Sequence, residues 1–246
     1  MTNKQNKIWI KANWPAPNHI KAGTTIRMGG HSNFPYNELN LGLNVGDNIK
    51  DVEKNRLKLK TFLNLPNDPI WLDQTHSKKI LPVDNAPIDL TADGSYTAQK
   101  NKVCVVTTAD CVPILFCDTE ENKVAAIHAG WKGICNGIIE DAVKIFSPSK
   151  SIIVWIGPAI SQRYYQVGEE VYCSFLERSI SLENAFKKNG KNWYCSLCKI
   201  VKIILNNLDI TEIYECGLCT YEMNNLFFSY RRDGKTGRTA TMIWIE

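Results

Sequence analysis

The sequence predicts an α/β fold in which helices flank mixed β-sheets. The chain has 246 residues and is 44% apolar, so it can bury a full core, and we expect one domain over residues 1–246. Short apolar segments typical of strands are interleaved with longer segments whose apolar residues recur every three or four positions. The two kinds do not alternate strictly, as they would in a doubly wound fold. We therefore expect a mixed sheet, or two packed sheets, with helices outside.

The first half of the chain is expected to hold one long helix and several short strands. Apolar residues in 49–63 recur at helical spacing, which predicts the helix. The stretch 29–47 before it is rich in Gly and Asn and predicts a loop. Apolar runs on either side of these two segments predict strands at 23–28, 69–77, 79–84, 103–118 and 123–130.

The second half is expected to be richer in helix. Amphipathic spacing predicts helices over 133–146, 168–180 and 196–208. Runs of β-branched and aromatic residues predict strands over 151–157, 212–217 and 239–246.

Charge and composition exclude several classes of partner. The formal net charge of +4, from 29 basic and 25 acidic residues, is too small for a nucleic-acid-binding surface, although a small anion remains a possible ligand. The chain has no apolar run of secretory or membrane-spanning length, so we expect a cytoplasmic protein without a membrane partner. Nine cysteines favour thiols and metal ligands over a disulfide framework.

Three potential metal ligands follow apolar runs. Cys111 in "TTADC" and His128 in "AAIHAG" lie where strands are expected to end, and His76 in "WLDQTHS" has a similar position. The chain has only two other histidines, His19 and His31, and both are expected in polar surface segments. Imidazole and thiolate together suit Zn²⁺, and three protein ligands leave a fourth position open, as in catalytic sites.

Other interpretations use the same residues. Cys111 and His128 could be ordinary core residues, or Cys111 could be a nucleophile activated by His128, with Asp110 or Asp73 orienting the histidine. That arrangement would make a metal-free cysteine hydrolase. A separate structural zinc site is suggested by two C-x₂-C pairs, but the first pair falls at a predicted helix start, which disfavours it; the pairs are Cys195/Cys198 and Cys216/Cys219.

The order of motifs along the chain resembles one known family. The motifs are "IRMGGHS", "NLGLNVGD", "NRLKL", "DQTHS", "TTADCVPILF", "AAIHAGWKG", "IGPAISQRYYQVGEEV" and "FFSYRRDGKTGR". Together they are similar to the successive signatures of the YfiH/PgeF family, which is described both as multicopper polyphenol oxidases and as purine nucleoside phosphorylases. The resemblance covers roughly residues 23 to 245.

The resemblance implies a fold, a metal site and an activity. It implies a four-layer sandwich of mixed sheets flanked by helices, shared with toxin-like cysteine hydrolases, and it places zinc ligands on His76, Cys111 and His128. The implied activity is cytosolic phosphorolysis of adenosine, inosine and methylthioadenosine, with adenosine deaminase activity. Other family descriptions imply a copper-dependent laccase or an editing role in peptidoglycan synthesis.

The chemistry of the residues ranks these activities. Four histidines are too few for the several copper ions of a laccase, which disfavours Cu²⁺. An open zinc site suits deamination because the metal lowers the pKa of its water toward ~7. A carboxylate must then carry the proton, and Asp110 and Asp73 are the local candidates.

Phosphorolysis also requires an anion pocket. The candidates are Arg27 beside Gly29 and Gly30, then Lys132, and then Arg231, with Arg232 and Arg238 as further possibilities. The resemblance implies an Arg at this position in most relatives, where this chain has Lys132. Lys keeps the positive charge but cannot make the bidentate contact with phosphate that a guanidinium makes.

We therefore expect a zinc-dependent purine nucleoside phosphorylase with adenosine deaminase activity, acting on small molecules as a monomer or homodimer. The main alternative is a metal-free cysteine hydrolase of peptidoglycan precursors that uses Cys111 and His128. A copper oxidase or a non-enzymatic metal-binding protein is the third.

Overall fold

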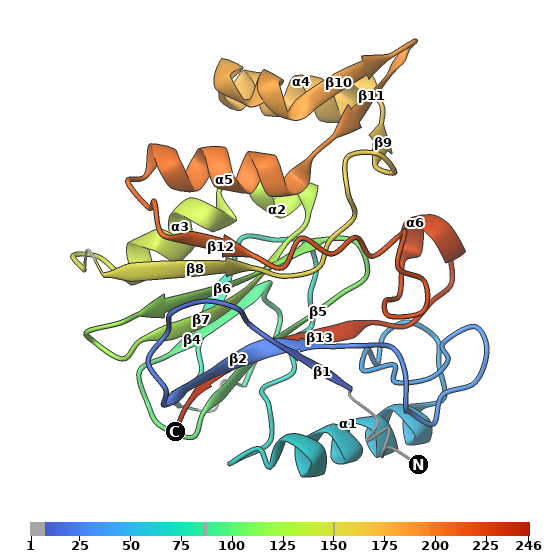
Figure 1. Cartoon of the computed structure of the whole chain (residues 1–246), viewed down its shortest axis with the longest axis vertical. Helices are drawn as coiled ribbons and strands as arrows, with labels where there is room; N and C mark the ends of the chain where they lie inside the picture. Colours follow the sequence, from blue (N-terminus) through green and yellow to red (C-terminus); the bar gives the residue numbers. More distant parts are fainter. Residues whose placement is uncertain (1–7, 86–87, 150) are drawn as a thin grey trace.

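Two β-sheets pack face to face, and helices cover their outer faces (Figure 1). The computed structural model describes residues 8–85, 88–149 and 151–246. The smaller sheet is antiparallel throughout and has the order β1 (Trp9–Lys11), β2 (Ile20–Thr25), β13 (Thr239–Ile245) and β5 (Val103–Thr108). The larger sheet has the order β12 (Ile213–Glu215), β8 (Ile152–Ile156), β6 (Val112–Asp118), β7 (Val124–Ala129), β4 (Gly94–Thr97) and β3 (Ile80–Pro82). Its two outermost pairs are parallel and its inner pairs antiparallel, so it is a mixed sheet.

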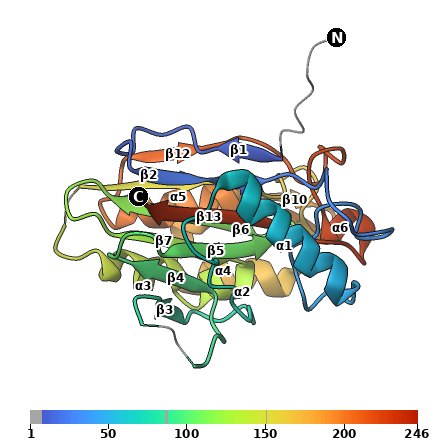
Figure 2. The same cartoon turned by 90° about the horizontal axis from the view of Figure 1, so that it is seen from below.

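The helices form the two outer layers. Helix α1 (Ile49–Leu63) covers the outer face of the four-stranded sheet, and Figure 2 shows it in front of that sheet. The six-stranded sheet is covered by α2 (Trp131–Cys135), α3 (Ile138–Ile145) and α5 (Leu197–Asn207). Beyond them lie α4 (Glu169–Arg178), the 3₁₀ helix η1 (Ile180–Ala185) and a small sheet of order β10 (Phe186–Asn189), β11 (Asn192–Cys195) and β9 (Gln166–Val167). The short helix α6 (Tyr230–Asp233) precedes β13.

Alternating side chains on the central strands explain why the layers stack. On β5, Val103 and Val105 pack toward α1, while Cys104 lies in the core between the two sheets. On β6, Leu115 packs into the core between the sheets, while Phe116 packs against the helices on the far side. Successive residues of a strand point to opposite faces, so strands buried on both sides read as continuous apolar runs. The predicted four-layer sandwich is confirmed.

Several element boundaries differ from the prediction. The strand expected at 23–28 is β2, which ends at Thr25, and the segment 69–77 forms only isolated bridges, such as Ile70 with Cys104. The helix expected over 133–146 is two helices, because Gly137 adopts φ 93° and ends the first of them. A Gly in this conformation breaks a helix at little steric cost. The short strands β1, β4, β9, β10 and β11 were not predicted, since runs of two to four residues carry little periodicity.

None of the helices within residues 8–85, 88–149 and 151–246 has the length and apolarity needed to cross a bilayer.

Asn55 on α1 holds the loop 29–47 in place. Its side chain is fully buried and donates to the hydroxyl of Ser32 at 2.9 Å and to the carbonyls of Glu38 and Asn40 at 3.2 and 2.9 Å. Its carbonyl accepts from the amide of His31 at 2.7 Å. A helix residue therefore supplies the hydrogen bonds that this loop cannot make within itself.

We predict that Asn55→Ala lowers the free energy of unfolding by about 3 kcal/mol, because it leaves several buried polar groups without partners. Urea denaturation measures the change. The matched control is Glu53→Ala on the exposed face of the same helix, which should shift stability by no more than about 0.5 kcal/mol. Equal stabilities of the two variants would contradict this role of Asn55.

Candidate functional site

Cys111 lies where the chain passes from one sheet to the other. β5 belongs to the four-stranded sheet and β6 to the six-stranded sheet, so residues 109–111 bridge them. Asp110 adopts φ 94°, and its buried carboxylate accepts hydrogen bonds from the hydroxyls of Thr220 at 2.6 Å and Ser229 at 3.0 Å and from the amide of Arg231 at 2.7 Å. These three bonds fix the turn that presents the Cys111 thiol.

His128 lies near the end of β7 and is oriented by a buried carboxylate. Its Nδ1 is 2.7 Å from Oδ1 of Asp93, and both side chains are nearly inaccessible to solvent. Since an ionised carboxylate only accepts hydrogen bonds, Nδ1 carries the proton. Nε2 is then the ring nitrogen left free to bind a metal.

The same carboxylate shapes the loop of His76. The amides of Thr75, His76 and Ser77 donate to Asp93 at 3.2, 2.9 and 2.6 Å, and the Ser77 hydroxyl donates at 2.7 Å. His76 adopts φ 62°, a left-handed conformation that is uncommon for a residue with a side chain. Burial raises the pKa of Asp93, but the hydrogen bonds from His128 and Ser77 outweigh it and lower the pKa to about 2. The carboxylate is therefore ionised at neutral pH.

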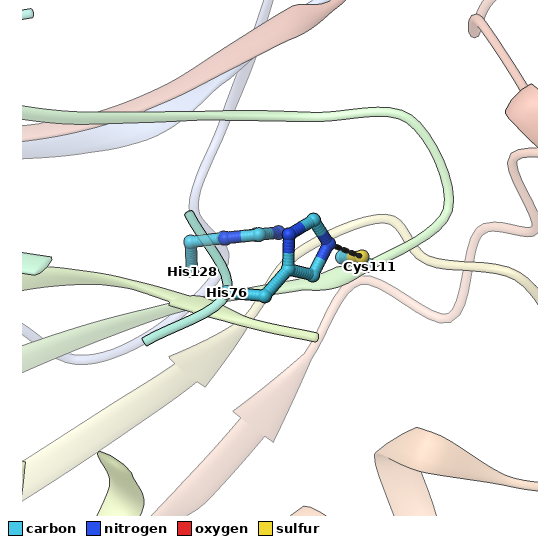
Figure 3. A group of neighbouring side chains, drawn as sticks. All are labelled: His76, Cys111 and His128. Atoms are coloured by element: carbon cyan, nitrogen blue, oxygen red, sulfur yellow. Dashed lines mark hydrogen bonds between the residues drawn. The ribbon is translucent and has the colours of Figure 1, made fainter. Parts of the chain in front are cut away.

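His76, Cys111 and His128, the donor trio, converge in space (Figure 3). Nε2 of His76 is 3.8 Å from Sγ of Cys111, and the ligand atoms of all three residues lie within 4.8 Å of one another. Tetrahedral zinc with ordinary bond lengths would hold such N and S atoms roughly 3.5 Å apart. The spacing therefore fits a metal after small side-chain adjustments.

Gly130 leaves room for the donor trio. A Cβ at this position would lie 2.7 Å from Cδ2 of His76 and 3.2 Å from Sγ of Cys111. Gly130 directly precedes α2, and any side chain there would displace the imidazole. The position in "HAGW" is therefore a glycine for a steric reason: it leaves space for the His76 imidazole.

Cys111 and His128 ionise together. Burial raises the pKa of the Cys111 thiol, but His128 and His76 beside it outweigh burial and lower the pKa to about 6. Burial lowers the pKa of His128, while the charges of Cys111 and Asp93 and their hydrogen bonds raise it to about 9. A thiolate beside an imidazolium is therefore favoured near neutral pH in the absence of metal.

The donor trio opens into a cavity of about 970 Å³. Its walls combine a carboxylate, two arginines and two aromatic rings, namely Asp73, Arg56, Arg238, Trp71 and Tyr230. A cavity of this size accommodates a small organic ligand.

Residues 21–246 match the model of the family described as multi-copper polyphenol oxidoreductase laccase. The chain belongs to this family. A Haemophilus influenzae member named "Purine nucleoside phosphorylase" is 45% identical, covering 96% of this chain and 99% of that protein. A Shigella flexneri member named "Purine nucleoside phosphorylase YfiH" is 41% identical, covering 96% and 98% of the two chains.

Solved structures of relatives share the fold. The Neisseria meningitidis protein NMB0706 matches with a TM-score of 0.91 and 35% identity, covering 98% of this chain and 100% of that one. YlmD from Geobacillus stearothermophilus matches with a TM-score of 0.87 and 29% identity, covering 99% and 98%. The predicted resemblance to the YfiH family is confirmed.

The two candidate acid–base residues have different surroundings. Asp73 lines the cavity, and its Oδ1 accepts from Nδ2 of Asn44 at 3.1 Å. Asp110 is not among the cavity-lining residues, and both of its oxygens already accept hydrogen bonds from Thr220, Ser229 and Arg231. Of the two, Asp73 is the carboxylate placed to reach a ligand.

Of the residues expected to bind phosphate, Arg238 lines this cavity, whereas Arg27, Gly29, Gly30, Lys132, Arg231 and Arg232 do not. Arg27 donates to the carbonyls of Asn37 and Asn224 and packs over the ring of Phe228 at 4.7 Å. The Gly29 amide already donates to the Glu38 carboxylate, and a Cβ on Gly30 would lie 2.2 Å from the Glu38 carbonyl oxygen. These glycines serve the close packing of the loop, with a carboxylate at the amide that was expected to bind an anion.

Lys132 and Arg231 also lie outside the cavity lining. Lys132 is exposed, with its ammonium over the ring of Trp131 at 5.7 Å. Arg231 is exposed, donates to the carbonyl of Gln166 at 2.7 Å and stacks over Tyr165 at 4.9 Å. Their basic charges therefore serve protein contacts in this structure.

The two C-x₂-C pairs do not assemble a second site. Among the described residues, His76, Cys111 and His128 are the one group of three or more donors placed to hold a metal. Cys195 is buried in the core between helices and sheet, while Cys219 exchanges hydrogen bonds with Ser161. The first pair, which the sequence already disfavoured as a zinc site, is divided between two elements: Cys195 ends β11, and Cys198 lies in the first turn of α5.

Sequence reasoning missed Asp93, Arg56 and Gly130. Asp93 follows no apolar run and resembles an ordinary turn aspartate in "TADGS". Arg56 lies within the recognised motif "NRLKL", but its position on the polar face of a predicted helix gave no sign that it lines a cavity. Gly130 lies within the recognised motif "AAIHAGWKG", and its position two residues after His128 was the available signal.

We predict that Asp93→Asn lowers zinc affinity by 10- to 100-fold, because the loop amides and His128 lose the ionised acceptor that orients them. Competition with a chromogenic chelator measures the affinity. The matched control is Asp89→Asn, an exposed carboxylate paired with Lys79, which should leave affinity unchanged. Unchanged affinity in Asp93→Asn would contradict the orienting role.

A second prediction concerns the thiol. In chelator-treated protein, alkylation of Cys111 should rise with pH through a midpoint near 6, because the thiolate forms above its lowered pKa. Mass spectrometry of the Cys111 peptide follows the reaction. His128→Ala removes the stabilising positive charge and should move the midpoint to higher pH. The same midpoint in both proteins would show that His128 does not stabilise the thiolate.

Proposed function

We propose that this protein is a zinc-dependent purine nucleoside phosphorylase. The observation that carries the proposal is a donor trio that opens into a cavity with cationic, aromatic and carboxylate walls. The names of the Haemophilus and Shigella relatives support the same activity. We propose adenosine, inosine and methylthioadenosine as substrates, with phosphate as the second, in the cytoplasm.

Zinc fits the donor set better than copper does. Two imidazoles and a thiolate are typical zinc ligands, and three protein ligands leave a position for substrate or water. Multicopper oxidases hold several copper ions with many histidines, and the whole chain has four. When bound, zinc supplies a Lewis acid at the edge of the cavity. Asp93 keeps His128 in the tautomer that binding requires.

The cavity residues suit the two substrates of phosphorolysis. A phosphate oxygen attacks C1′ of the ribose, the C1′–N9 bond breaks, and the purine leaves with the electron pair and takes up a proton. Positive charge develops on the sugar, and we assign Asp73, a carboxylate that lines the cavity, to stabilise this charge or to hold a ribose hydroxyl. Tyr230, which lines the cavity and is largely exposed, offers an aromatic face for the base.

Adenosine deamination is proposed as a second activity of the same site. It requires water instead of phosphate and a carboxylate that transfers a proton between water and the purine. Asp73 is the candidate for this transfer, because it borders the cavity and Asp110 does not.

A specific observation also favours a metal-free cysteine hydrolase. Cys111, His128 and Asp93 have the order of nucleophile, base and orienting carboxylate, with a thiol pKa of about 6. His76, however, places a second imidazole 3.8 Å from the same sulfur, and a hydrolase of this kind has no need of it. A metal site uses all three donors, and it remains our proposal. In the hydrolase, the carboxylate that orients His128 would be Asp93, and not Asp110 or Asp73 as the sequence suggests.

We predict close to one zinc per chain, and we expect incubation of adenosine with phosphate to yield adenine and ribose 1-phosphate. Ribose 1-phosphate should disappear when phosphate is omitted, whereas inosine formed by deamination should persist. Cys111→Ala should abolish both zinc binding and phosphorolysis, because it removes the thiolate ligand. Elemental analysis and chromatography of the products measure these outcomes.

Full zinc content in Cys111→Ala would contradict the donor trio. If zinc-loaded protein forms neither product while a thiol-alkylating reagent blocks hydrolysis of an amide substrate, the cysteine hydrolase replaces our proposal.

A further inference from the structure

Two arginines line the cavity without a carboxylate partner. Arg56 and Arg238 are both partly buried, and neither forms an ion pair within 4.0 Å among residues 8–85, 88–149 and 151–246. Burial lowers the pKa of Arg56 to about 10, and it also lowers the pKa of Arg238. A partly desolvated guanidinium is stabilised by an anion. Two of them on one cavity indicate an anionic ligand.

Arg56 is held rigidly with one nitrogen free. Its Nε and Nη2 both donate to the carbonyl of Leu41, at 3.1 and 2.9 Å, and its guanidinium lies 3.8 Å from the ring centroid of Trp71. Within the described residues, Nη1 donates to no protein group, so its hydrogens are available to a ligand. Stacking and hydrogen bonds fix the plane of the group in advance of binding.

Arg238 is fixed against the same stretch of loop. Its carbonyl accepts from the amide of Leu41 at 3.1 Å, and its Nη1 donates to the carbonyls of Thr236 and Gly237 at 2.9 and 3.0 Å. Its Nη2 donates to no group in the described part of the chain. Each arginine therefore has one terminal nitrogen uncommitted.

Gly42 leaves room for the Arg238 side chain beside this loop. A Cβ at Gly42 would lie 2.8 Å from Cγ of Arg238, near the root of that side chain, where it cannot easily move aside. Since Leu41 contacts both arginines, the Leu41–Gly42 backbone sets their relative placement.

We propose that Arg56 and Arg238 form the subsite that binds phosphate in the cavity of the donor trio, with Gly42 setting its geometry. The subsite deepens the proposed phosphorolysis and rests on it for its use in the reaction, although binding of phosphate is measurable by itself. It replaces Arg27, whose guanidinium is committed to the carbonyls of Asn37 and Asn224. Guanidinium groups suit phosphate because each presents several donors in a fixed plane.

The test is titration of inorganic phosphate into the full-length, zinc-loaded protein by isothermal calorimetry, at constant ionic strength in chloride. Wild-type protein should bind one phosphate per chain, and Arg56→Gln and Arg238→Gln should each weaken the affinity about tenfold or more. The matched control is Arg163→Gln, which removes an exposed arginine that lies over Tyr164 and outside the cavity. Its affinity should stay within about twofold of wild type.

Gly42→Ala provides a second route to the same answer. It keeps both charges but displaces Arg238, so it should also weaken phosphate binding while leaving zinc content at one per chain. Thermal unfolding of each variant verifies the fold. If Arg56→Gln unfolds, Arg238→Gln and Gly42→Ala decide the question.

The outcomes separate this subsite from the proposed function. Phosphate affinity, or KM for phosphate, that is equal in wild type, Arg238→Gln and Gly42→Ala overturns the subsite even if the enzyme phosphorolyses adenosine. Absence of phosphate binding by wild type overturns it as well. Arginine-dependent phosphate binding without any phosphorolysis supports the subsite and contradicts the proposed function.

Discussion

The site depends on one buried carboxylate. Asp93 accepts hydrogen bonds from three consecutive amides, from the Ser77 hydroxyl and from Nδ1 of His128. It thereby joins a loop and a strand end that are far apart in the sequence and gives each the conformation that points its histidine inward. A buried charge is tolerated only when it is paired and hydrogen-bonded, and here the groups that satisfy it also hold the metal donors. The stability of this position and the geometry of the donor trio therefore rest on the same contacts.

The two packed sheets supply the remaining positions. Cys111 lies on the crossing from one sheet to the other, so its thiol is presented at the edge of the sandwich without being buried in either core. Asp110 fastens this crossing to the C-terminal segment through Thr220 and Ser229. The loop 29–47 closes another side of the cavity and is fixed to α1 by Asn55. Elements from the whole length of the chain thus meet around one small volume.

Sequence reasoning reached the fold and the donor trio for identifiable reasons. The helix predicted over 49–63 matches α1 at both ends, because its periodicity is long and an Asn caps each end. The donors were found because imidazoles are rare in this chain and those not placed on the surface followed apolar runs. The glycines beside Arg27 resemble a phosphate-binding loop in the sequence, whereas in the structure the Gly29 amide donates to the Glu38 carboxylate and Arg27 lies outside the cavity lining. Which side chain meets which cavity is a tertiary property, and for Arg56 and Asp93 no local pattern carries it.

The position of β13 in its sheet has a consequence for how the molecule is made. β13 lies between β2 and β5, and Thr241 contacts Thr24 across 217 residues of sequence. A nascent chain that has not yet reached residue 239 lacks β13, the strand that pairs with both β2 and β5. The edge of β2 that pairs with β13 therefore stays unpaired until nearly the whole protein has been translated. Closing so long a loop is slow and exposes a strand edge to other chains. The Cys111 crossing likewise gains its anchors at Thr220 and Ser229 only after most of the chain has been made.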